Sequence, residues 1–467
     1  MSTTLRRINI ILISVLSNLI VFGQNTTKWL YDFQAPTLAF ESTYFLGSPS
    51  IDNTFIDNYF NGAYLGEYMK KTTFNNLTTT NVFGAHNNFK LSLTLPALGG
   101  GSTVAYYFGI ENKNIVDLKF NNNLFKMFFN GNKQFAGDTL HIKDNFMSFT
   151  GFSQLKGGIV KQIKGKKVQH TFLGVLSLNV GTAQNNIHIN NARFYTDPEG
   201  ALLDADLNMI YQGVKNNSPA KVKIVNGLGT GIDFCYNLKS NKGNNFTIAF
   251  TDIGFIRWFK QYSSVIKKDT AIKFEGIEIK DILDIGASTK DLNKDSIQKK
   301  ITDMIVKKPY TSYLPMTMQL YYYREISKVF EVGAGLKYIF NTAFRPYYFV
   351  DAKLYLLQHL MISPTISFGG YSGFNIGVDL GLNIKQFNLY VGSDYLTPYL
   401  DNEKYRGKGY YLKIVRKLGY GPKSFEGSDY VRVYNKPRLP KYKADIFSNS
   451  LINKKTNFNQ NDSIKQP

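Results

Sequence analysis

The stretch FNIGVDLGLNI, residues 374–384, alternates strictly between large apolar residues and small or polar ones. The even positions hold Phe374, Ile376, Val378, Leu380, Leu382 and Ile384. The odd positions hold Asn375, Gly377, Asp379, Gly381 and Asn383. Because successive side chains of a β-strand point to opposite faces, this pattern predicts a strand with one apolar and one polar face. A soluble antiparallel sheet and the wall of a membrane barrel both fit it.

The same alternation recurs along most of the chain. Its clearest copies are NFKLSLTL (88–95), TVAYYFGI (103–110), KVKIVNGLGTGIDFCYN (221–237), VFEVGAGLKYIF (329–340) and YFVDAKLYL (348–356). Weaker copies lie near 38–48, 152–163, 170–180, 245–255, 315–323, 360–369, 386–396 and 409–418. Many of these runs are longer than the roughly five or six residues of an ordinary strand. A tilted strand of about ten residues crosses an outer membrane, so we predict an all-β fold, a transmembrane antiparallel β-barrel of about 14 strands.

The polar face and the aromatic residues favour this barrel over a soluble β-protein. The predicted inward positions repeatedly carry Gly, Asn, Asp and Lys, which suit a solvated lumen. Aromatic residues near the ends of the runs, such as Tyr338, Phe340, Tyr347 and Tyr395, suit girdles at the two membrane interfaces. We therefore expect the apolar face of 374–384 to contact lipid.

The N-terminus predicts export. Arg6 and Arg7 precede an apolar stretch, and Val21 and Gly23 have the spacing that signal peptidase requires. We expect a signal peptide over 1–23, cleaved after Gly23, and location in the outer membrane of a Gram-negative cell. A retained membrane-anchoring helix is the alternative, and the quick return to polar residues after Gly23 argues against it.

Charge and rare residue types narrow the partners. The 467 residues include 55 Lys and Arg against 34 Asp and Glu, which gives a formal net charge of +21. An exported basic protein has the anionic envelope as its neighbour, so we expect contact with outer-membrane lipid and lipopolysaccharide and none with nucleic acid. The single Cys235 and the five scattered His offer no metal-ligand spacing. We expect no metal, no cofactor and no catalytic residue.

Three regions depart from the strand pattern. Apolar residues in 112–131 recur at helical spacing, which predicts a short helix at the barrel mouth or in the lumen, where it would restrict the pore. A charged insert over 264–310 shows helical spacing near its end. The tail 422–467 is basic and polar, so we expect it to be disordered. The predicted layout is a signal peptide, a barrel over 24–421 and this tail.

The polar face of the predicted strands supplies the candidate functional residues. We expect seven of them to face the lumen: Asp233, Asp351, Lys353, Asn375, Asp379, Asn383 and Asp394. Such residues would line a polar pore. As catalytic carboxylates they lack a partner signature, and the simpler interpretation is a solvated lumen.

Five stretches resemble a known family. They are YFLGSPSI (44–51), NNNLFKMFFNGNKQFAGDTL (121–140), IKFEGIEIKDIL (272–283), YTSYLPMTMQLYYYREISKVFEVGAGLKY (310–338) and FNLYVGSDYLTPYLDNEKYRGKGYYLKIVRKLGYG (387–421). In these stretches the chain resembles an uncharacterised outer-membrane barrel family of Bacteroidota, a domain of unknown function related to the FadL-like barrels. The resemblance implies a barrel fold and an outer-membrane location and implies no chemistry. The start of the barrel, QAPTLAFEST (34–43), lacks the Asn-Pro-Ala step usual there in these barrels.

Two functions from different classes fit these patterns. The first is a passive channel or transporter for hydrophobic or small solutes, with a lumen helix as its constriction. The second is a non-transporting scaffold whose basic tail and charged insert bind periplasmic or surface proteins, as in secretion or gliding machinery. An outer-membrane enzyme is a third class. Passage of solute through the purified barrel favours the first function, and stable co-purification with envelope proteins favours the second.

Val378 tests whether the apolar face of 374–384 contacts lipid. An arginine in the middle of the bilayer is costly, so Val378→Arg should lower the free energy of unfolding by about 2–4 kcal/mol. Asp379→Asn, on the opposite face, should change it little. Urea unfolding of the barrel in lipid vesicles measures both values, and equal tolerance at the two sites would place the strand outside a membrane.

Overall fold

The computed structural model describes residues 35–97, 103–131, 133–199, 202–214, 225–275, 306–356, 360–384, 387–401 and 405–418. The predicted signal peptide, the helix in the insert and the basic tail lie outside these residues. The strands are β1 (Thr37–Gly47), β2 (Asn81–Pro96), β3 (Val104–Phe120), β4 (Thr139–Lys164), β5 (Val168–Thr196), β6 (Leu202–Val214), β7 (Gly227–Ser240), β8 (Asn244–Trp258), β9 (Ser263–Glu275), β10 (Val306–Lys307), β11 (Tyr310–Tyr313), β12 (Thr317–Ser327), β13 (Phe330–Ile339), β14 (Arg345–Leu356), β15 (Leu360–Gly370), β16 (Asn375–Ile384), β17 (Phe387–Ser393) and β18 (Lys408–Lys417). The helices are α2 (Asn53–Phe60), α3 (Glu67–Asn76), α4 (Asn122–Asn130), the 3-10 turn η1 (Lys133–Phe135) and α7 (Thr397–Leu400).

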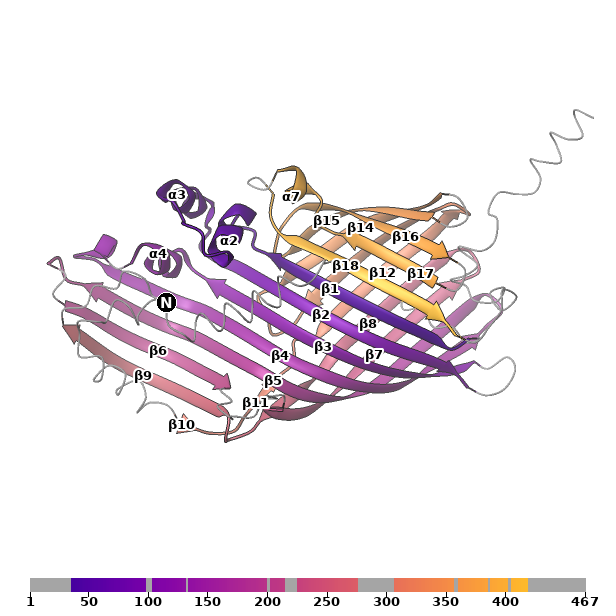
Figure 1. Cartoon of the computed structure of the whole chain (residues 1–467), viewed down its shortest axis with the longest axis horizontal. Coiled ribbons are helices and arrows are strands. Elements are labelled where there is room, and N and C mark those ends of the chain that lie inside the picture. Colours follow the sequence, from indigo (N-terminus) through magenta and orange to yellow (C-terminus); the bar gives the residue numbers. More distant parts are fainter. Residues whose placement is uncertain are drawn as a thin grey trace, which may run out of the picture.

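Fourteen antiparallel strands close into a barrel (Figure 1). The ring runs β1-β2-β3-β4-β5-β7-β8-β12-β13-β14-β15-β16-β17-β18 and returns to β1. Closure rests on the ladder between β1 and β18, which runs from the pair Thr37↔Lys417 to the pair Leu46↔Lys408. A closed ring leaves no free strand edge in the wall, which is the condition for a sheet to cross a membrane. The predicted fold class is confirmed.

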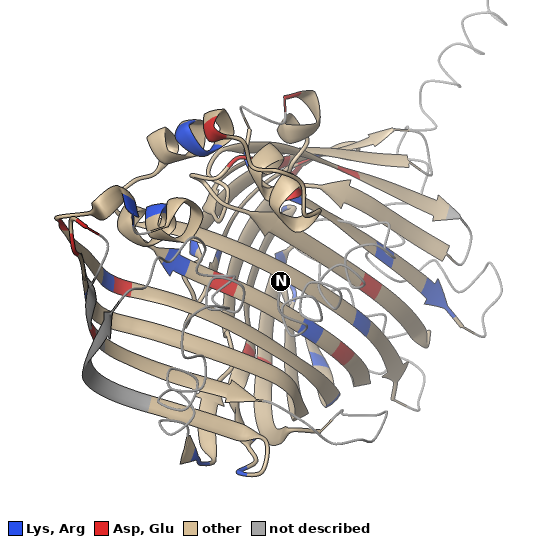
Figure 2. Ribbon diagram, turned by 60° about the vertical axis from the view of Figure 1, so that its left-hand side comes forward, with Lys and Arg blue, Asp and Glu red and all other residues tan. Residues whose placement is uncertain are grey.

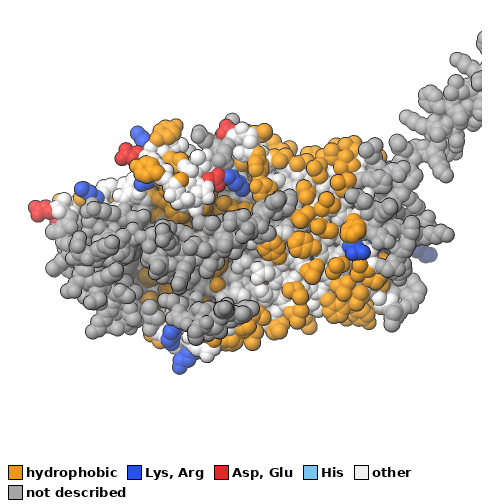
Figure 3. Space-filling model, in the orientation of Figure 1, with side chains coloured by type: hydrophobic (Ala, Val, Ile, Leu, Met, Phe, Trp, Pro, Cys, Tyr) orange, Lys and Arg blue, Asp and Glu red, His pale blue; other side chains and the backbone are white. Residues whose placement is uncertain are grey.

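The outer face of the ring carries a belt of exposed apolar side chains. On β16 the side chains of Ile376, Leu380 and Leu382 are 40–43% exposed, whereas Gly377 and Asp379 between them are buried. Figure 3 shows the apolar side chains gathered in a band over the barrel wall. Exposed apolar surface of this extent on a closed barrel identifies the wall that contacts lipid.

The two ends of the barrel differ in their connections. At one end both described chain termini lie together, and the backbone N–H of Leu418 donates to the Pro36 carbonyl at 2.9 Å. Tight hairpins join β4 to β5, β7 to β8 and β12 to β13 at this hairpin end. The opposite loop end carries the helices α2, α3, α4 and α7 (Figure 1). In bacterial outer-membrane barrels, short turns and termini face the periplasm and long loops face outward.

The same sheet continues beyond the loop end of the barrel. β4 and β5 are 26 and 29 residues long and pair along almost their whole length. β5 pairs with β7 as far as Gly181, and from Asn185 onward it pairs with β6, which pairs with β9. Figure 1 shows these strands running past the barrel. We call β6, β9 and the adjoining halves of β4 and β5 the outer sheet.

The helix predicted over 112–131 is wrong in its first half. Residues 112–120 complete β3, because the strand pairs with β2 on one side and β4 on the other up to this point. The helix α4 begins only after Asn121, whose side chain accepts a hydrogen bond from the Leu124 backbone N–H at 2.8 Å. Phe125 of α4 packs against Phe55 of α2 at the loop end, with ring centroids 5.7 Å apart. Among the described residues, no helix has the length and apolarity to cross a membrane.

The ladder between β1 and β18 predicts where the chain can be shortened. Truncation after Pro422 should leave folded barrel in the membrane, because β18 is complete at Lys417 and the residues beyond it are too polar to offset the entropy of ordering them. Truncation after Gly407 removes β18 and should abolish assembly. Heat-modifiable migration in gels reports folding of both forms. Loss of folded barrel in the longer form would show that the tail belongs to the fold.

Candidate functional site

The inner wall of the barrel is layered along its axis. On β3, Tyr107 belongs to an apolar cluster near the hairpin end, Glu111 and Lys113 follow at mid-height, and Ile115 belongs to another apolar cluster towards the loop end. The mid-height level continues around the wall on other strands. We call it the waist, and its members are Glu41, Lys90, Glu111, Lys113, Lys156, Asp233, Asp252, Asp351, Lys353 and Lys413.

Neighbouring strands of the waist carry charges of alternating sign. The Glu41 carboxylate of β1 lies 3.0 Å from the Lys413 ammonium of β18 and 3.7 Å from the Lys90 ammonium of β2. Lys90 lies directly opposite Glu111 of β3 in the ladder. Figure 2 shows basic and acidic residues side by side on these strands. Such cross-strand pairs follow from the register alone.

Lys156 of β4 connects strands that are not adjacent. Its ammonium lies 2.6 Å from Glu111 of β3, 2.8 Å from Asp233 of β7 and 3.8 Å from Asp252 of β8. Lys113 of β3 also binds Asp252, at 2.5 Å. β4, β5 and β7 lie between β3 and β8 in the wall. The contact between Lys113 and Asp252 therefore spans the lumen.

A bulge in β8 turns Asp252 toward the lumen. The buried positions of β8 are Asn245 and Ala249, with odd numbers, and then Asp252, Ile256 and Trp258, with even numbers. The change of parity coincides with a register shift against β7 and with a φ of 62° at Asp252, in the left-handed region. The extra residue of a bulge thus adds one carboxylate to the waist.

The charges of the waist residues on β1, β2, β3, β4, β7, β8 and β18 cancel. The four carboxylates of Glu41, Glu111, Asp233 and Asp252 meet the four lysines 90, 113, 156 and 413. Lys156 is only 4% exposed, and the two aspartates are 3% exposed. Side chains lining a wide water-filled pore would be solvated, so the waist is a packed ionic layer. In the described part of the chain, no three His, Cys, Asp or Glu side chains are placed to hold a metal ion.

The opposite side of the waist joins charge to aromatic rings. The hydroxyl of Tyr321 donates to the Asp351 carboxylate at 2.9 Å. Lys353 lies 3.0 Å from the same carboxylate and donates to the Tyr321 hydroxyl at 2.5 Å. The Lys353 ammonium also lies 4.8 Å from the ring centre of Tyr321 and 5.4 Å from that of Tyr323, within cation–π range. The ion pair is thereby attached to the first rings of a longer row.

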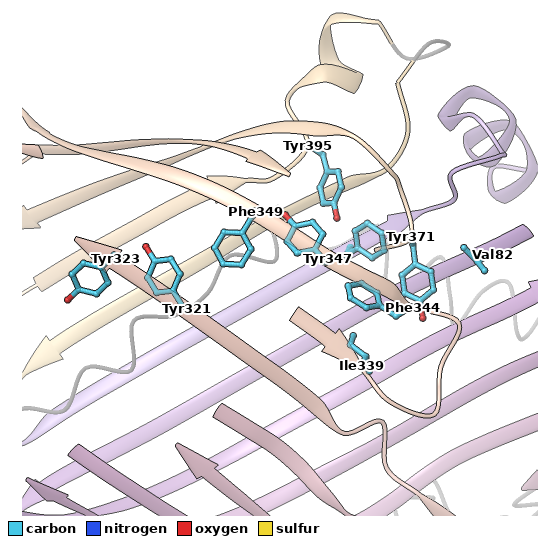
Figure 4. Close-up of a cluster of buried hydrophobic side chains, with 10 residues drawn as sticks. Val82, Tyr321, Tyr323, Ile339, Phe344, Tyr347, Phe349, Tyr371 and Tyr395 are labelled. Carbon is cyan, nitrogen blue, oxygen red and sulfur yellow. The ribbon is translucent and has the colours of Figure 1, made fainter. Parts of the chain in front are cut away.

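Figure 4 shows these aromatic side chains following one another from Tyr323 on β12 to Tyr371 toward the loop end, and we call them the aromatic row. Its members in order are Tyr323, Tyr321, Phe349, Tyr347, Phe344 and Tyr371. Successive ring centroids lie 5.1 to 6.4 Å apart. These spacings match the distances at which aromatic rings attract one another. The aromatic row is therefore a continuous array of packed rings of low polarity along the barrel axis, and its members are 0–8% exposed.

Two turns close the loop end of the row, and Asp117 of β3 holds them. Its carboxylate accepts the Tyr371 hydroxyl at 2.6 Å and the Ala343 backbone N–H at 2.9 Å. These residues belong to the β15–β16 and β13–β14 turns, across the lumen from β3. Tyr371 lies flat on Gly84 of β2, where a Cβ would come within 2.2 Å of its ring. We call the contacts of Asp117 with the two turns the mouth latch. Among the described residues, two turns thus reach across the lumen near the loop end, whereas α4, predicted for the mouth or the lumen, packs against α2.

The seven residues predicted to face the lumen lie on the inner side of the barrel. Asn375, Asp394, Asp233, Asn383, Asp351 and Asp379 are 0–7% exposed, and the side chain of Lys353 is 13% exposed. The structure brings Asp351 and Lys353 together and joins Asp233 to the waist. Asn375 lies near the loop end, where its side chain binds Ser372 at 3.1 Å. Their role as a pore lining stays a prediction.

Sequence reasoning missed the centre of the waist. Lys156 occupies the polar face of an alternating run, so the strand period was the signal that could have placed it inside. The position of Asp252 could not be read that way, because the bulge reverses the alternation.

Comparisons with known proteins bear on the family and the fold. The family of unknown function DUF5723 matches residues 36–394. This chain belongs to that family. The predicted resemblance to a barrel family of unknown function is confirmed, and the structural relatives include FadL-like outer-membrane barrels. A search of curated proteins found no relative.

Three solved structures illustrate the similarity. The toluene transporter TodX of Pseudomonas putida shares 7% identity at a TM-score of 0.34, with 82% of this chain and 88% of that chain covered. A TodX deltaS2S3 mutant, described as a monoaromatic hydrocarbon channel, shares 8% identity at a TM-score of 0.40, with 82% of this chain and 89% of that chain covered. A FadL homologue of Pseudomonas aeruginosa shares 8% identity at a TM-score of 0.38, with 82% of this chain and 91% of that chain covered. Since all three TM-scores lie below 0.5, the function of this chain has to be inferred from its own residues.

Lys156 tests whether the waist holds the barrel together. Lys156→Met removes the shared cation of three buried carboxylates, which should lower the free energy of unfolding by about 3–5 kcal/mol. Lys143→Met is the control, because it changes an exposed lysine on the same strand and should cost less than about 0.5 kcal/mol. Urea unfolding in vesicles measures both. A loss of similar size for the two variants would show that the waist pairs contribute little.

Proposed function

We propose that the protein is an outer-membrane β-barrel that acts as a passive channel for small hydrophobic solutes. The lipid-facing belt and the signal-peptide pattern of residues 1–23 support this location. The proposed role requires no chemical change in the solute and no cofactor.

The single observation that carries the proposal is the aromatic row. Its rings are packed in the lumen, so an uncharged, ring-bearing molecule that displaces neighbouring side chains would meet a continuous apolar surface from Tyr371 at the loop end to Tyr323 at the waist. The ionic half of the waist offers no such surface, because its charges are engaged with one another and would be costly to separate. A hydrophobic solute is therefore expected to move along the β12–β16 side.

Beyond the waist the same side of the barrel is again apolar. Tyr355, Met361, Tyr390 and Tyr411 form a buried cluster there, toward the hairpin end. Apolar contacts thus lie on both sides of the ion pair between Asp351 and Lys353. Passage through this level requires side-chain rearrangement, which suits slow facilitated diffusion rather than open-pore flow.

The mouth latch predicts how entry is controlled. Asp117→Asn replaces one acceptor oxygen at the turns by a donor, and Tyr371→Phe removes one hydroxyl donor. Both variants weaken the mouth latch and should admit solute faster than the wild type, by about tenfold, since a hydrogen bond to a charged group contributes about 1.5–3 kcal/mol. Uptake of the uncharged aromatic dye 1-N-phenylnaphthylamine by a Gram-negative host measures entry. Cells expressing the wild type should take up the dye faster than cells without the barrel.

Two controls define failure of the channel proposal. Phe349→Ala interrupts the aromatic row without touching the latch, and it should slow dye entry in the Asp117→Asn background. Entry of an anionic probe should be unchanged throughout. If the wild type and the latch variants all match cells without the barrel, while heat-modifiability shows that they are folded, the protein is not a channel for this class of solute.

A non-transporting scaffold is the second candidate, and surface residues at the loop end favour it. Tyr64, Tyr68 and Leu400 are 84–86% exposed there. Such apolar side chains suit a protein partner better than water. Co-purification of an envelope protein that is lost on Tyr64→Ser and Tyr68→Ser, together with absence of dye entry, would favour the scaffold.

A further inference from the structure

Three neighbouring hairpins form a continuous rim at the hairpin end. The backbone N–H of Asn241, between β7 and β8, donates to the Lys167 carbonyl, between β4 and β5, at 3.0 Å. The Asn241 side chain also donates to the Lys166 carbonyl at 2.7 Å. On the other side, the Glu325 backbone N–H of β12 donates to the Gly243 carbonyl at 2.9 Å. The relative positions of side chains on the three hairpins are thus fixed by the backbone.

This rim is strongly basic. The β4–β5 hairpin presents Lys161, Lys164, Lys166 and Lys167, all exposed. The β7–β8 hairpin adds Lys239 and Lys242, and the β12–β13 hairpin adds Arg324 and Lys328. The segments 161–168, 239–245 and 324–330 contain these eight basic residues and one acidic residue, Glu325. We call these eight residues the basic rim.

The basic rim borders directly on the lipid-facing belt. Lys161 lies on the outer face of β4 between Ile159 and Ile163, which are 54% and 50% exposed. On β12–β13, Ile326 and Val329 are 57% and 40% exposed beside Lys328. Lysines at such a boundary extend their stems over the apolar surface and place the ammonium at the level of the lipid headgroups.

We propose that the basic rim binds the phosphate groups of anionic phospholipids in the inner leaflet of the outer membrane. The rim lies at the end with the chain termini and tight hairpins, which faces the periplasm in barrels of this kind, so lipopolysaccharide is on the other side. Its cations follow the circumference of the wall beside exposed isoleucines, as a bilayer surface requires. This inference is independent of the solute that the lumen carries.

The test measures lipid retention by the full-length barrel. Native mass spectrometry in detergent with equal dioleoyl phosphatidylglycerol and dioleoyl phosphatidylcholine should show preferential retention of the glycerol lipid by the wild type. A variant with Lys164, Lys166, Lys167 and Lys242 changed to Gln should lose roughly tenfold or more of that preference, since each surface cation contributes to attraction by anionic lipid. Raising the salt to 0.5 M should weaken the wild-type preference as well.

The matched control changes four lysines away from this end, at Lys71, Lys119, Lys133 and Lys143, to Gln. It loses the same net charge and should keep the wild-type lipid preference, and heat-modifiability confirms that both variants are folded. Equal retention by the rim variant and the wild type would overturn the proposal. So would equal loss in the control, which would indicate a response to net charge alone. Unchanged lipid retention with loss of an acidic envelope protein from the rim variant would assign the basic rim to a protein partner instead.

Discussion

Charge neutralisation inside the lumen is the constraint on which the rest of this barrel depends. An isolated ion cannot be buried without a large cost, so each carboxylate of the waist must have a cation within reach. Lys156 and Lys113 satisfy this condition by joining β3 and β4 to β7 and β8 above β5. These contacts fix the cross-section on one side of the barrel. The aromatic side is held by ring packing and one ion pair, and it is the side that can adapt.

The barrel itself could be predicted from the sequence, because lipid imposes a period of two on every strand that crosses it. The run at 374–384 has the predicted faces, with Ile376 exposed and Asp379 buried. The outer sheet could not be predicted in the same way. Outside the membrane both faces of a strand can be mixed. Within the barrel, the end of β3 was missed for another reason, because Asn and Lys at 112–120 interrupt the alternation and imitate helical spacing. Pairing with β2 and β4 then decided the outcome.

The candidate site was predictable only in part. Alternation places a residue such as Asp233 or Asp351 on the inner face, but it cannot say which residues meet across the lumen. The contact between Lys113 and Asp252 depends on a bulge in β8, and the mouth latch joins Asp117 to Ala343 and Tyr371, 226 and 254 residues away. Such contacts follow from closure of the ring, which is a property of the whole chain.

The division of β5 between two ladders has a mechanical consequence. Below Gly181 this strand belongs to the lipid-embedded wall, and above Asn185 it belongs to the outer sheet. A hydrogen-bonded strand resists stretching, so torque applied to the outer sheet is transmitted along β5 to Ser177 and Asn179, which lie between the waist residues of β4 and β7. We therefore expect that a partner that tilts the outer sheet also displaces the ionic layer of the waist.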